Sequence, residues 1–323
     1  MKRAKSQEPR ANSSSLRAIL ALTLGCQLSA VGSHALTGRG GTSLFPFLGM
    51  QPGARAAAMG EAFSAYGEGV DALAYNPAGL ADMELGEMSF SHGAWFQGIN
   101  YENISMAVPV SLFKFNVKAS VGLSYSLLRL PEIDRTELDS GFAETPSGID
   151  QFVEGAGKFS VDGQSFEIAV GSEANSYLDV GVKARFPRQN IADDKLSAAT
   201  FDIGTIASAG PGMKAALVFK NLGPSVRGSD LPTSFTIGAL RKFYRLTGWD
   251  DDLALAGDAI LPIKPSSQKP RFHAGLEYLR KVGTKGISIR AGYRHGYDLG
   301  GLAGRSLGGG LGFQTGRGVT RLD

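Results

Sequence analysis

The sequence predicts an all-β fold: a transmembrane, antiparallel up-and-down β-barrel with an N-terminal segment that plugs its lumen. From Glu87 onward, apolar residues recur at every second position, the spacing that gives a strand one apolar and one polar face. The expected strands are about 9 to 11 residues long, as a tilted strand must be to cross a bilayer. Their connections alternate between short and long, as they do when turns and loops lie on opposite sides of one membrane. A soluble sandwich shows the same alternation of side chains, so strand length and connections decide between the two.

The composition favours the same class. The chain has 44 glycines in 323 residues and 20% charged residues, and its mean hydropathy is −0.04. These values suit many short strands joined by glycine-rich turns better than they suit helices. No run of about 18 apolar residues occurs, which argues against membrane-spanning helices.

Residues 1–35 are predicted to be an export signal. Lys2, Arg3, Lys5, Arg10 and Arg17 form a basic N-terminal region, Leu16 to Gly25 form an apolar stretch, and Ser33-His34-Ala35 forms a small-x-small cleavage site. Removing this leader takes away five of the 33 basic residues and one of the 30 acidic ones, which leaves 28 against 29. Because the mature chain is then nearly neutral, we expect no nucleic acid among its partners.

The only cysteine, Cys26, lies inside this leader. Cleavage at Gly25 and acylation of Cys26 would make a lipoprotein, but Thr23 stands where such signals usually carry Leu, so a discarded leader cysteine is favoured. The mature chain would then have no thiol for disulfides, metal sites or nucleophilic catalysis.

Within residues 36–85, the segment from Gly53 to Leu80 shows no strand alternation and is dense in small side chains. We expect residues 36–85 to fill the lumen of a barrel formed by residues 86–323, as a structural or a gating plug. Within this segment, Asn76 can cap a short turn through its side-chain oxygen, while Pro77 fixes the backbone at the next position.

The barrel strands follow from the alternation. The clearest cover residues 117–125, 178–186 and 287–294, and weaker ones lie near 88–96, 103–112, 160–171, 198–207, 213–221, 233–242, 252–261 and 271–280. If the apolar faces meet lipid, the polar faces line the lumen, where mixed charges would form salt bridges with the plug rather than an open conduit. The lumen-facing charged residues are predicted to be Lys118, Asp179, Lys183, Arg185, Glu277, Arg290 and Arg294.

The connections sort into two sets. Short turns are expected near 112–115, 172–176, 209–212, 281–284 and 316–318, and long connections at 129–159, 187–197, 221–231, 262–270 and 297–305. The link from Tyr244 to Asp251 is longer than a turn but belongs to the short set by position.

No catalytic or cofactor signature is present. The four histidines show no metal-ligand spacing. The glycine-rich runs at 38–41 and 308–312 lack the preceding strand, the following helix and the Lys-Ser/Thr ending of a phosphate loop. No GxSxG motif of a serine hydrolase occurs. The acidic connection from Arg129 to Gly157 is predicted to be a solvated outer loop, with contact to divalent cations or lipopolysaccharide as the alternative. We expect no enzyme activity and no cofactor.

Several motifs resemble those of the PorV/PorQ group, relatives of the FadL long-chain fatty-acid transporters. They are Gly53-Ala54-Arg55-Ala56-Ala57-Ala58-Met59-Gly60-Glu61-Ala62-Phe63, Tyr75-Asn76-Pro77-Ala78-Gly79-Leu80, Asn221-Leu222-Gly223-Pro224 with Leu231-Pro232, and Arg290-Ala291-Gly292-Tyr293-Arg294 with Gly296-Tyr297-Asp298-Leu299-Gly300-Gly301-Leu302. The similarity spans roughly residues 45 to 323, in the order that the group shows.

This resemblance implies an outer-membrane barrel of a Gram-negative-type cell, with fourteen strands and a hatch to which Arg55, Asn76, Pro77, Ala78 and Gly79 would belong. It implies contact with outer-membrane lipid and lipopolysaccharide, and a role with secretion-system proteins of type IX. The alternative is transport of a hydrophobic ligand, as in FadL. A surface-attached enzyme or a soluble periplasmic β-protein is the third possibility, from a different class.

The chain departs from the group at its end. Members continue past the motif that Arg321-Leu322-Asp323 represents, whereas this chain stops at Asp323 after about twelve strands and the start of a thirteenth. We therefore expect either a sequence that lacks its last strands or a barrel that closes in a smaller register.

Overall fold

The structure is a computed structural model. It describes residues 44–112, 117–138, 152–265, 268–283, 285–296, 305–315 and 320–322. The predicted leader with Cys26, and the first part of the predicted plug segment, lie outside these ranges.

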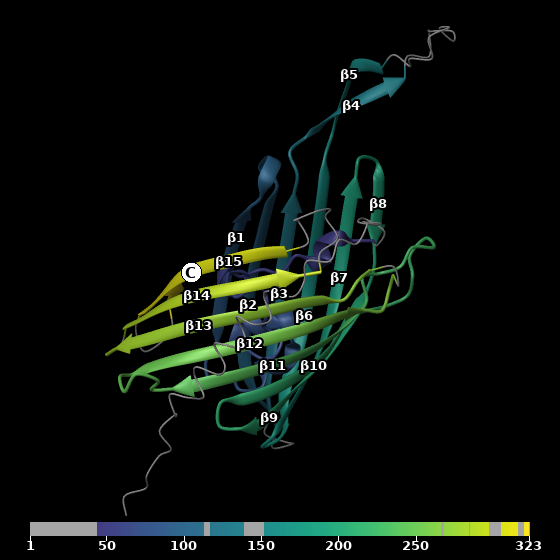
Figure 1. The fold of residues 1–323 in the computed structure, drawn as a ribbon. Helices are drawn as coiled ribbons and strands as arrows, with labels where there is room; N and C mark the ends of the chain where they lie inside the picture. Colours follow the sequence, from purple (N-terminus) through teal and green to yellow (C-terminus); the bar gives the residue numbers. More distant parts are fainter. Residues whose placement is uncertain are drawn as a thin grey trace, which may run out of the picture.

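One antiparallel sheet contains most of the described chain (Figure 1). Its strands follow one another in the order β1-β2-β3-β6-β7-β9-β10-β11-β12-β13-β14-β15-β16, and β8 pairs with β7 beside this path. Their bounds are β1 (Glu87–Ala94), β2 (Asn100–Leu112), β3 (Val117–Arg129), β6 (Val161–Asn175), β7 (Leu178–Ile191), β8 (Asp194–Ser197), β9 (Thr200–Gly210), β10 (Met213–Leu222), β11 (Ser234–Tyr244), β12 (Asp251–Pro262), β13 (Arg271–Val282), β14 (Lys285–His295), β15 (Arg305–Thr315) and β16 (Thr320–Leu322). This is the up-and-down antiparallel order that the alternation predicts.

The ends of the sheet carry the two predicted kinds of connection. The turns after β6 and β9 lie at one end, and the Tyr244–Asp251 link lies there with them. We call this the short-turn end. Longer connections follow β3, β10 and β12 at the opposite end. Of the other predicted connections, residues 113–115, 297–304 and 316–318 lie outside the described residues.

Two predicted loops contain strands instead. Within residues 129–159, β4 (Ile133–Leu138) and β5 (Phe152–Phe159) form a separate two-stranded sheet that projects beyond the main one (Figure 1). Within residues 187–197, β7 continues to Ile191 and forms a hairpin with β8. Both extensions carry more polar residues than the strands below them, which hid their alternation in the sequence.

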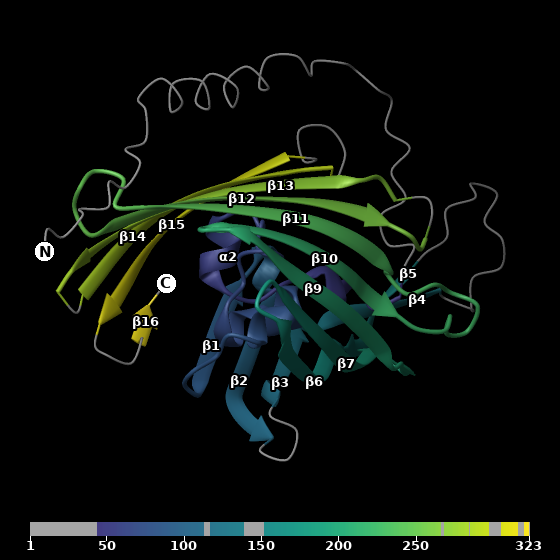
Figure 2. The ribbon, with the colours of Figure 1, turned by 90° about the horizontal axis from the view of Figure 1, so that it is seen from below.

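The path contains thirteen strands, and the last of them, β16, has three residues. This agrees with the expected twelve strands and the start of a thirteenth. Among the described residues, β1 pairs only with β2 and β16 only with β15, so the sheet curls without closing on itself (Figure 2).

The sheet is inverted relative to a soluble protein, with apolar side chains on its convex face and polar ones on its concave face. On β6, Phe166 is 46% exposed and its neighbour Glu167 is 6% exposed. On β7, Val182 is exposed while Lys183 and Arg185 are buried. Outward-facing residues of the same kind include Ile104, Leu123, Ile168, Phe201, Ile203, Leu217, Phe219, Ile237, Phe272, Ile287, Ile289, Leu311 and Phe313.

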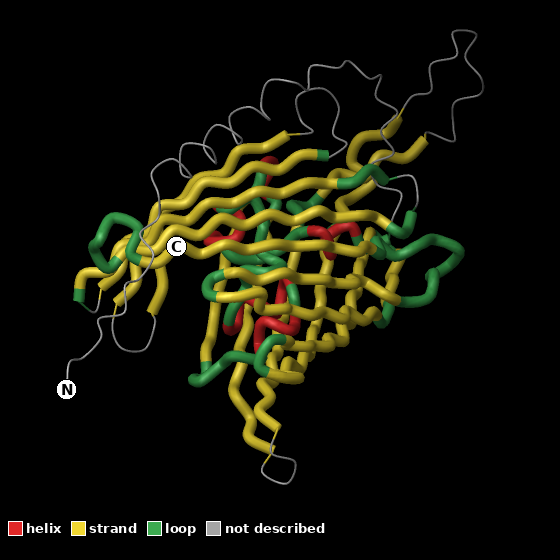
Figure 3. Tube along the Cα trace, turned by 60° about the horizontal axis from the view of Figure 1, so that its bottom comes forward, coloured by secondary structure: helices red, strands yellow, loops and turns green. Residues whose placement is uncertain are grey.

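Residues 44–86 lie inside the curve of the sheet, and we call them the plug (Figures 2 and 3). They form short helical turns: η1 (Pro46–Gly49), α2 (Ala54–Ala58), η2 (Gly69–Asp71), α3 (Ala72–Tyr75) and η3 (Pro77–Leu80). A further turn, η4 (Phe96–Gly98), joins β1 to β2. The largest apolar cluster lies between plug and sheet: Met59, Phe63, Tyr66 and Tyr75 pack there with Ile206 and Leu240 of the strands. In the described part of the chain, no helix has both the length and the apolar character that a membrane crossing requires.

Candidate functional site: the interface between plug and sheet

Inward-facing glycines let the main chain of the plug lie directly on the strands. A Cβ atom at Gly275 of β13 would lie 2.5 Å from the carbonyl oxygen of Met59, and one at Gly171 of β6 would lie 2.5 Å from that of Pro77. Because the opposing atoms are backbone, no side-chain rotation could relieve either contact. Similar close approaches to the plug occur at Gly181, Gly204, Gly238, Gly292, Gly308 and Gly310. Glycine weakens a strand unless another backbone needs the space, and here the plug needs it.

Asn76 joins the plug to itself and to the sheet. It is fully buried, and its side-chain oxygen accepts a hydrogen bond of 3.1 Å from the Ala78 amide at the start of η3, where Pro77 is the first residue. This is the predicted cap. Its side-chain amide donates to the carbonyl oxygens of Ser64 at 3.0 Å and Thr205 of β9 at 3.2 Å. Gly79 follows in the same turn, where its amide donates to the carbonyl of Asn76.

Arg55 forms a buried ionic contact with the sheet. Its guanidinium donates to both carboxylate oxygens of Glu277 on β13, at 3.1 and 2.7 Å. Arg290 of β14 donates to the same carboxylate at 2.6 Å, and the Tyr66 hydroxyl of the plug also donates to it. The side chains of Arg55, Glu277 and Arg290 are at most 8% exposed, so one carboxylate neutralises part of two buried positive charges.

A second ionic cluster lies on β6, β7 and β9. The Lys183 ammonium lies 2.9 Å from Asp202 and 3.2 Å from Glu167, and Arg185 lies 2.9 Å from Glu167. Lys183 also donates to the carbonyl oxygen of Leu73 in α3 at 2.7 Å. This cluster is therefore balanced in charge within the sheet and still bonds the plug.

Two further strand residues bond the main chain of the plug. The Asp258 carboxylate of β12 accepts from the amides of Phe63 and Ser64, each at 3.0 Å, and from the Ser64 hydroxyl at 2.6 Å. Lys220 of β10 donates to the carbonyl of Ala74 at 3.2 Å. Strands β7, β10, β12 and β13 thus reach the plug through these polar side chains.

The remaining predicted lumen residues lie apart from these clusters. Arg294 is half-buried and donates to Glu61 of the plug at 2.6 Å. Asp179 is buried near the short-turn end of β7, whereas Lys118 is exposed near the start of β3. Lys118 therefore lies at the rim and contributes to neither ionic cluster.

At the short-turn end, the plug is held by surface charges. The Lys242 ammonium lies 2.7 Å from the Glu68 carboxylate, and that of Lys214 lies 3.8 Å from it. Burial alone would raise the pKa of the Glu68 carboxyl, but these two positive charges outweigh it and hold that pKa below its usual value.

Sequence reasoning missed several residues of this interface, namely Glu167, Asp202, Asp258, Lys220, Ser64 and Tyr66. The first four lie in strands that the alternation predicts, so extending the in-and-out assignment to every strand would have placed them. Ser64 and Tyr66 lie in the plug, where no periodicity marks a buried face.

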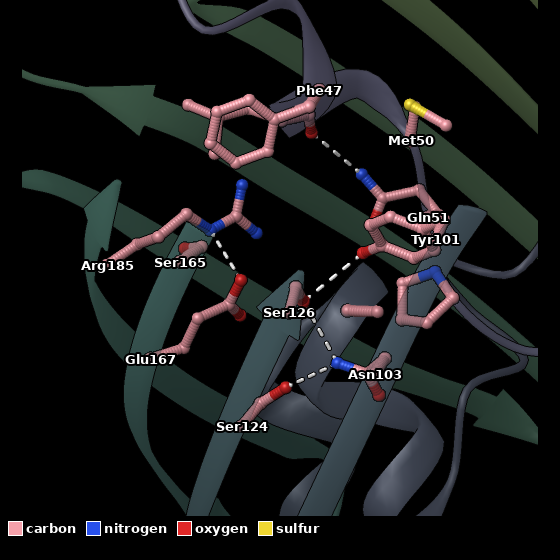
Figure 4. Close-up of a pocket in the computed structure, with 13 residues that line it drawn as sticks. Phe47, Met50, Gln51, Tyr101, Asn103, Ser124, Ser126, Ser165, Glu167 and Arg185 are labelled. Carbon is pink, nitrogen blue, oxygen red and sulfur yellow. Dashed lines mark hydrogen bonds and ion pairs between the residues drawn. The ribbon is translucent and has the colours of Figure 1, made fainter. Parts of the chain in front are cut away.

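Two cavities border the plug on the side of β1 to β3. The larger, of about 610 Å³, lies along the edge strand β1 from Glu87 to Gly93 and is also lined by the plug between Met50 and Ala57, by Trp95 and by Tyr101. Charged side chains of Glu61, Asp71 and Arg294 line it as well. The smaller, of about 10 Å³, lies between η1 and the inner faces of β2, β3, β6 and β7 (Figure 4). Among the described residues, no group of three or more His, Cys, Asp or Glu side chains could hold a metal ion.

The comparisons with known proteins identify no family for this chain. No family model and no curated protein matches the sequence. Among solved structures, the chain is similar to CdiB from Acinetobacter baumannii, with 10% identity and a TM-score of 0.40, over 72% of this chain and 53% of that one. The chain thus spans about half the length of CdiB.

Proposed function

We propose that this chain is a non-enzymatic outer-membrane β-barrel of the PorV type, which acts as an accessory in secretion or assembly at the cell surface. The assignment to a membrane rests on the inverted sheet, which has an apolar convex face and a charged concave face. In water, such a convex face would expose more apolar surface than a monomeric protein normally shows. In a bilayer, the same arrangement is the expected one.

Aromatic residues near the sheet ends support this placement. Tyr177, Tyr244 and Trp249 are exposed at the short-turn end, and Trp95 is exposed at the other. Tyr and Trp gather at the two water interfaces of a membrane protein because their rings are amphipathic.

The membrane proposal includes closure of the sheet. Unpaired backbone groups are costly in hydrocarbon, which leaves closed barrels as the stable β-structures there. A closed barrel migrates faster on a denaturing gel before heating than after it. We expect this shift for the chain purified from outer membranes in detergent, and recovery of the processed chain as a soluble protein without detergent would refute the membrane assignment.

The fixed plug supports an accessory role over conduction through the centre. Main-chain contacts at the inward glycines and buried bonds from four strands oppose its displacement. A pulldown from outer-membrane extract, with the tagged full chain as bait, tests the role. We expect secreted or secretion-system proteins to be retained, and retention of lipid alone would contradict it.

The cavity beside β1 favours a second candidate, a FadL-like transporter of hydrophobic molecules. Its lining includes Met50, Val70, Met88, Phe90 and Trp95. Uptake of a long-chain fatty acid that is lost on deleting residues 71–80, and retained in a folded control variant with an exposed substitution such as Glu173→Gln, would support transport and displace the accessory role.

A further inference from the structure

The plug begins at the end of the sheet that carries the long connections, which we call the long-connection end. Its first described residue, Leu44, donates its backbone amide to the carbonyl oxygen of Asp230 at 3.1 Å. Asp230 lies in the connection from β10 to β11, which joins these strands at that end. Further along the plug, the Glu68 carboxylate lies 2.7 Å from Lys242 at the short-turn end. The plug therefore crosses the lumen from one end to the other, and it starts at the long-connection end.

A buried apolar cluster holds the start of the plug in this position. Phe45 is fully buried, and Phe47 and Leu48 are nearly so. These three side chains form one cluster with Leu231 of the connection after β10. Residues near the long-connection ends of β3 and β8 pack against this cluster, namely Leu128 and Leu196. The contacts come from both sides of the lumen, so the start of the plug is fixed at its mouth.

The backbone of Phe45 is held as firmly as its side chain. Its φ is 52°, in the left-handed region that a bulky residue rarely adopts. Such a conformation persists where the surrounding contacts determine it. The Phe45 ring also packs edge-on against that of Phe47, with ring centroids 6.2 Å apart. The direction in which the chain leaves Leu44 is therefore set by packing.

The predicted mature chain has too few residues before Leu44 to return to the short-turn end. Residues 36–43 are all that separate Leu44 from the predicted cleavage site after Ala35. Fully extended, this segment would cover at most about 29 Å, from about 3.6 Å per residue. The hydrocarbon core of a membrane is about 30 Å thick, and the headgroup regions bring the total to about 40–45 Å. The segment therefore ends on the side where it leaves the plug.

We propose that the mature N-terminus is displayed at the cell surface, an inference that rests on the proposed membrane function. In outer-membrane barrels the short turns face the periplasm and the longer loops face the exterior, so Leu44 lies at the outer end. Residues 36–43 contain a single apolar side chain, Leu36, and a single charge, Arg39, so contact with water suits them. The proposed accessory role thereby gains a terminal segment, beside the connection after β10, that partners outside the cell can reach.

Labelling of single cysteines in whole cells tests this proposal, because removal of Cys26 with the leader leaves the mature chain without a thiol. Three variants each carry one new cysteine: Thr42→Cys before the plug, Lys195→Cys on β8 at the long-connection end, and Ser176→Cys in the turn after β6. Lys195 and Ser176 are both exposed. The probe is a maleimide coupled to a polyethylene glycol that is too large to cross the outer membrane, and labelling is read as a mass shift on a gel.

We expect Thr42→Cys and Lys195→Cys to be labelled in intact cells, and Ser176→Cys only after the outer membrane is disrupted. Labelling of Thr42→Cys only after disruption, or only in the denatured chain, would overturn the proposal. Labelling of Ser176→Cys but not of Lys195→Cys in intact cells would show the opposite orientation and would overturn it as well. Heat-dependent gel migration is measured on every variant. A chain that migrates as a barrel but hides Thr42→Cys overturns the displayed N-terminus alone, whereas loss of the heat-dependent shift in all variants overturns the membrane assignment.

A cross-link tests the position of the plug start independently of access to the large probe. Oxidation should join Leu44→Cys to Asp230→Cys, because the backbones of these two residues are hydrogen-bonded. It should not join Leu44→Cys to Ser176→Cys, which is the control pair at the short-turn end. A chain that migrates as a barrel and forms only the second cross-link would overturn the proposal.

Discussion

Replacing Glu277 by Gln tests whether the plug is held by buried charge. The carboxylate receives bonds from Arg55 at 2.7 and 3.1 Å, from Arg290 at 2.6 Å and from the Tyr66 hydroxyl. Glutamine keeps the shape of the side chain but removes its negative charge. Its NH2 group would also face the donor groups that now bond the carboxylate, which are those of Arg55, Arg290 and Tyr66. Breaking a buried ion pair by removing one partner costs about 3–5 kcal/mol. We expect a loss of that size.

The assay is unfolding in guanidinium chloride of the detergent-solubilised chain, followed by tryptophan fluorescence and checked by gel migration. Glu173→Gln, an exposed substitution on β6, is the control and should stay within about 0.5 kcal/mol. The double change Arg55→Met with Glu277→Gln should recover part of the loss, because it also removes the buried Arg55 charge that the Glu277 carboxylate neutralises. A loss below about 1 kcal/mol for Glu277→Gln would mean that water screens the pair and that the plug is not held this way.

Three more outcomes follow from the interface. Gly275→Val should destabilise the folded chain by about 1–3 kcal/mol through overpacking, because its Cβ would meet the Met59 carbonyl. Gly257→Val is the control and should be nearly neutral in the same unfolding assay, because only the His273 carbonyl lies near that position, at 3.8 Å. Asn76→Ala leaves buried partners without bonds and should cost about 1–3 kcal/mol; an unchanged unfolding midpoint would contradict the capping role. The pKa of Glu68 is lowered in the folded chain. Its bond to Lys242 therefore contributes fully to stability when the pH is above the ordinary carboxyl pKa, and this contribution is lost as the pH falls through the lowered pKa of the folded chain. Cleavage of the plug by pepsin, which is active in acid, should therefore increase as the pH falls through this range, and Glu68→Gln should remove that pH dependence.

Much of the sheet could be predicted because its alternation is a local property. Val180 and Val182 face outward on β7, whereas Lys183 and Arg185 face inward. Successive side chains of a strand point to opposite faces, so the direction of one residue fixes the direction of all the others. The cap at Asn76 was also predictable, since its bond to Ala78 joins residues two positions apart. Such features depend on neighbours in the chain.

The pairing of plug and sheet could not be predicted from the sequence. Arg55 and Glu277 are 222 positions apart, and no periodicity links them. The partners of Lys183 illustrate the same limit: its inward direction follows from the alternation, but its bond to the Leu73 carbonyl depends on how α3 lies in the lumen. The β7–β8 hairpin was missed because its residues are polar on both faces.

The plug is attached unequally around the sheet. Polar groups of β7, β10, β12 and β13, from Lys183 to Glu277, bond the plug directly. Those on the inner faces of β2 and β3, such as Asn103 and Ser124, bond one another. Both cavities beside the plug also lie on the side of β1 to β3. The polar bonds that hold the plug are therefore concentrated on the opposite part of the sheet, and we expect substitutions there, rather than on β2 and β3, to loosen it.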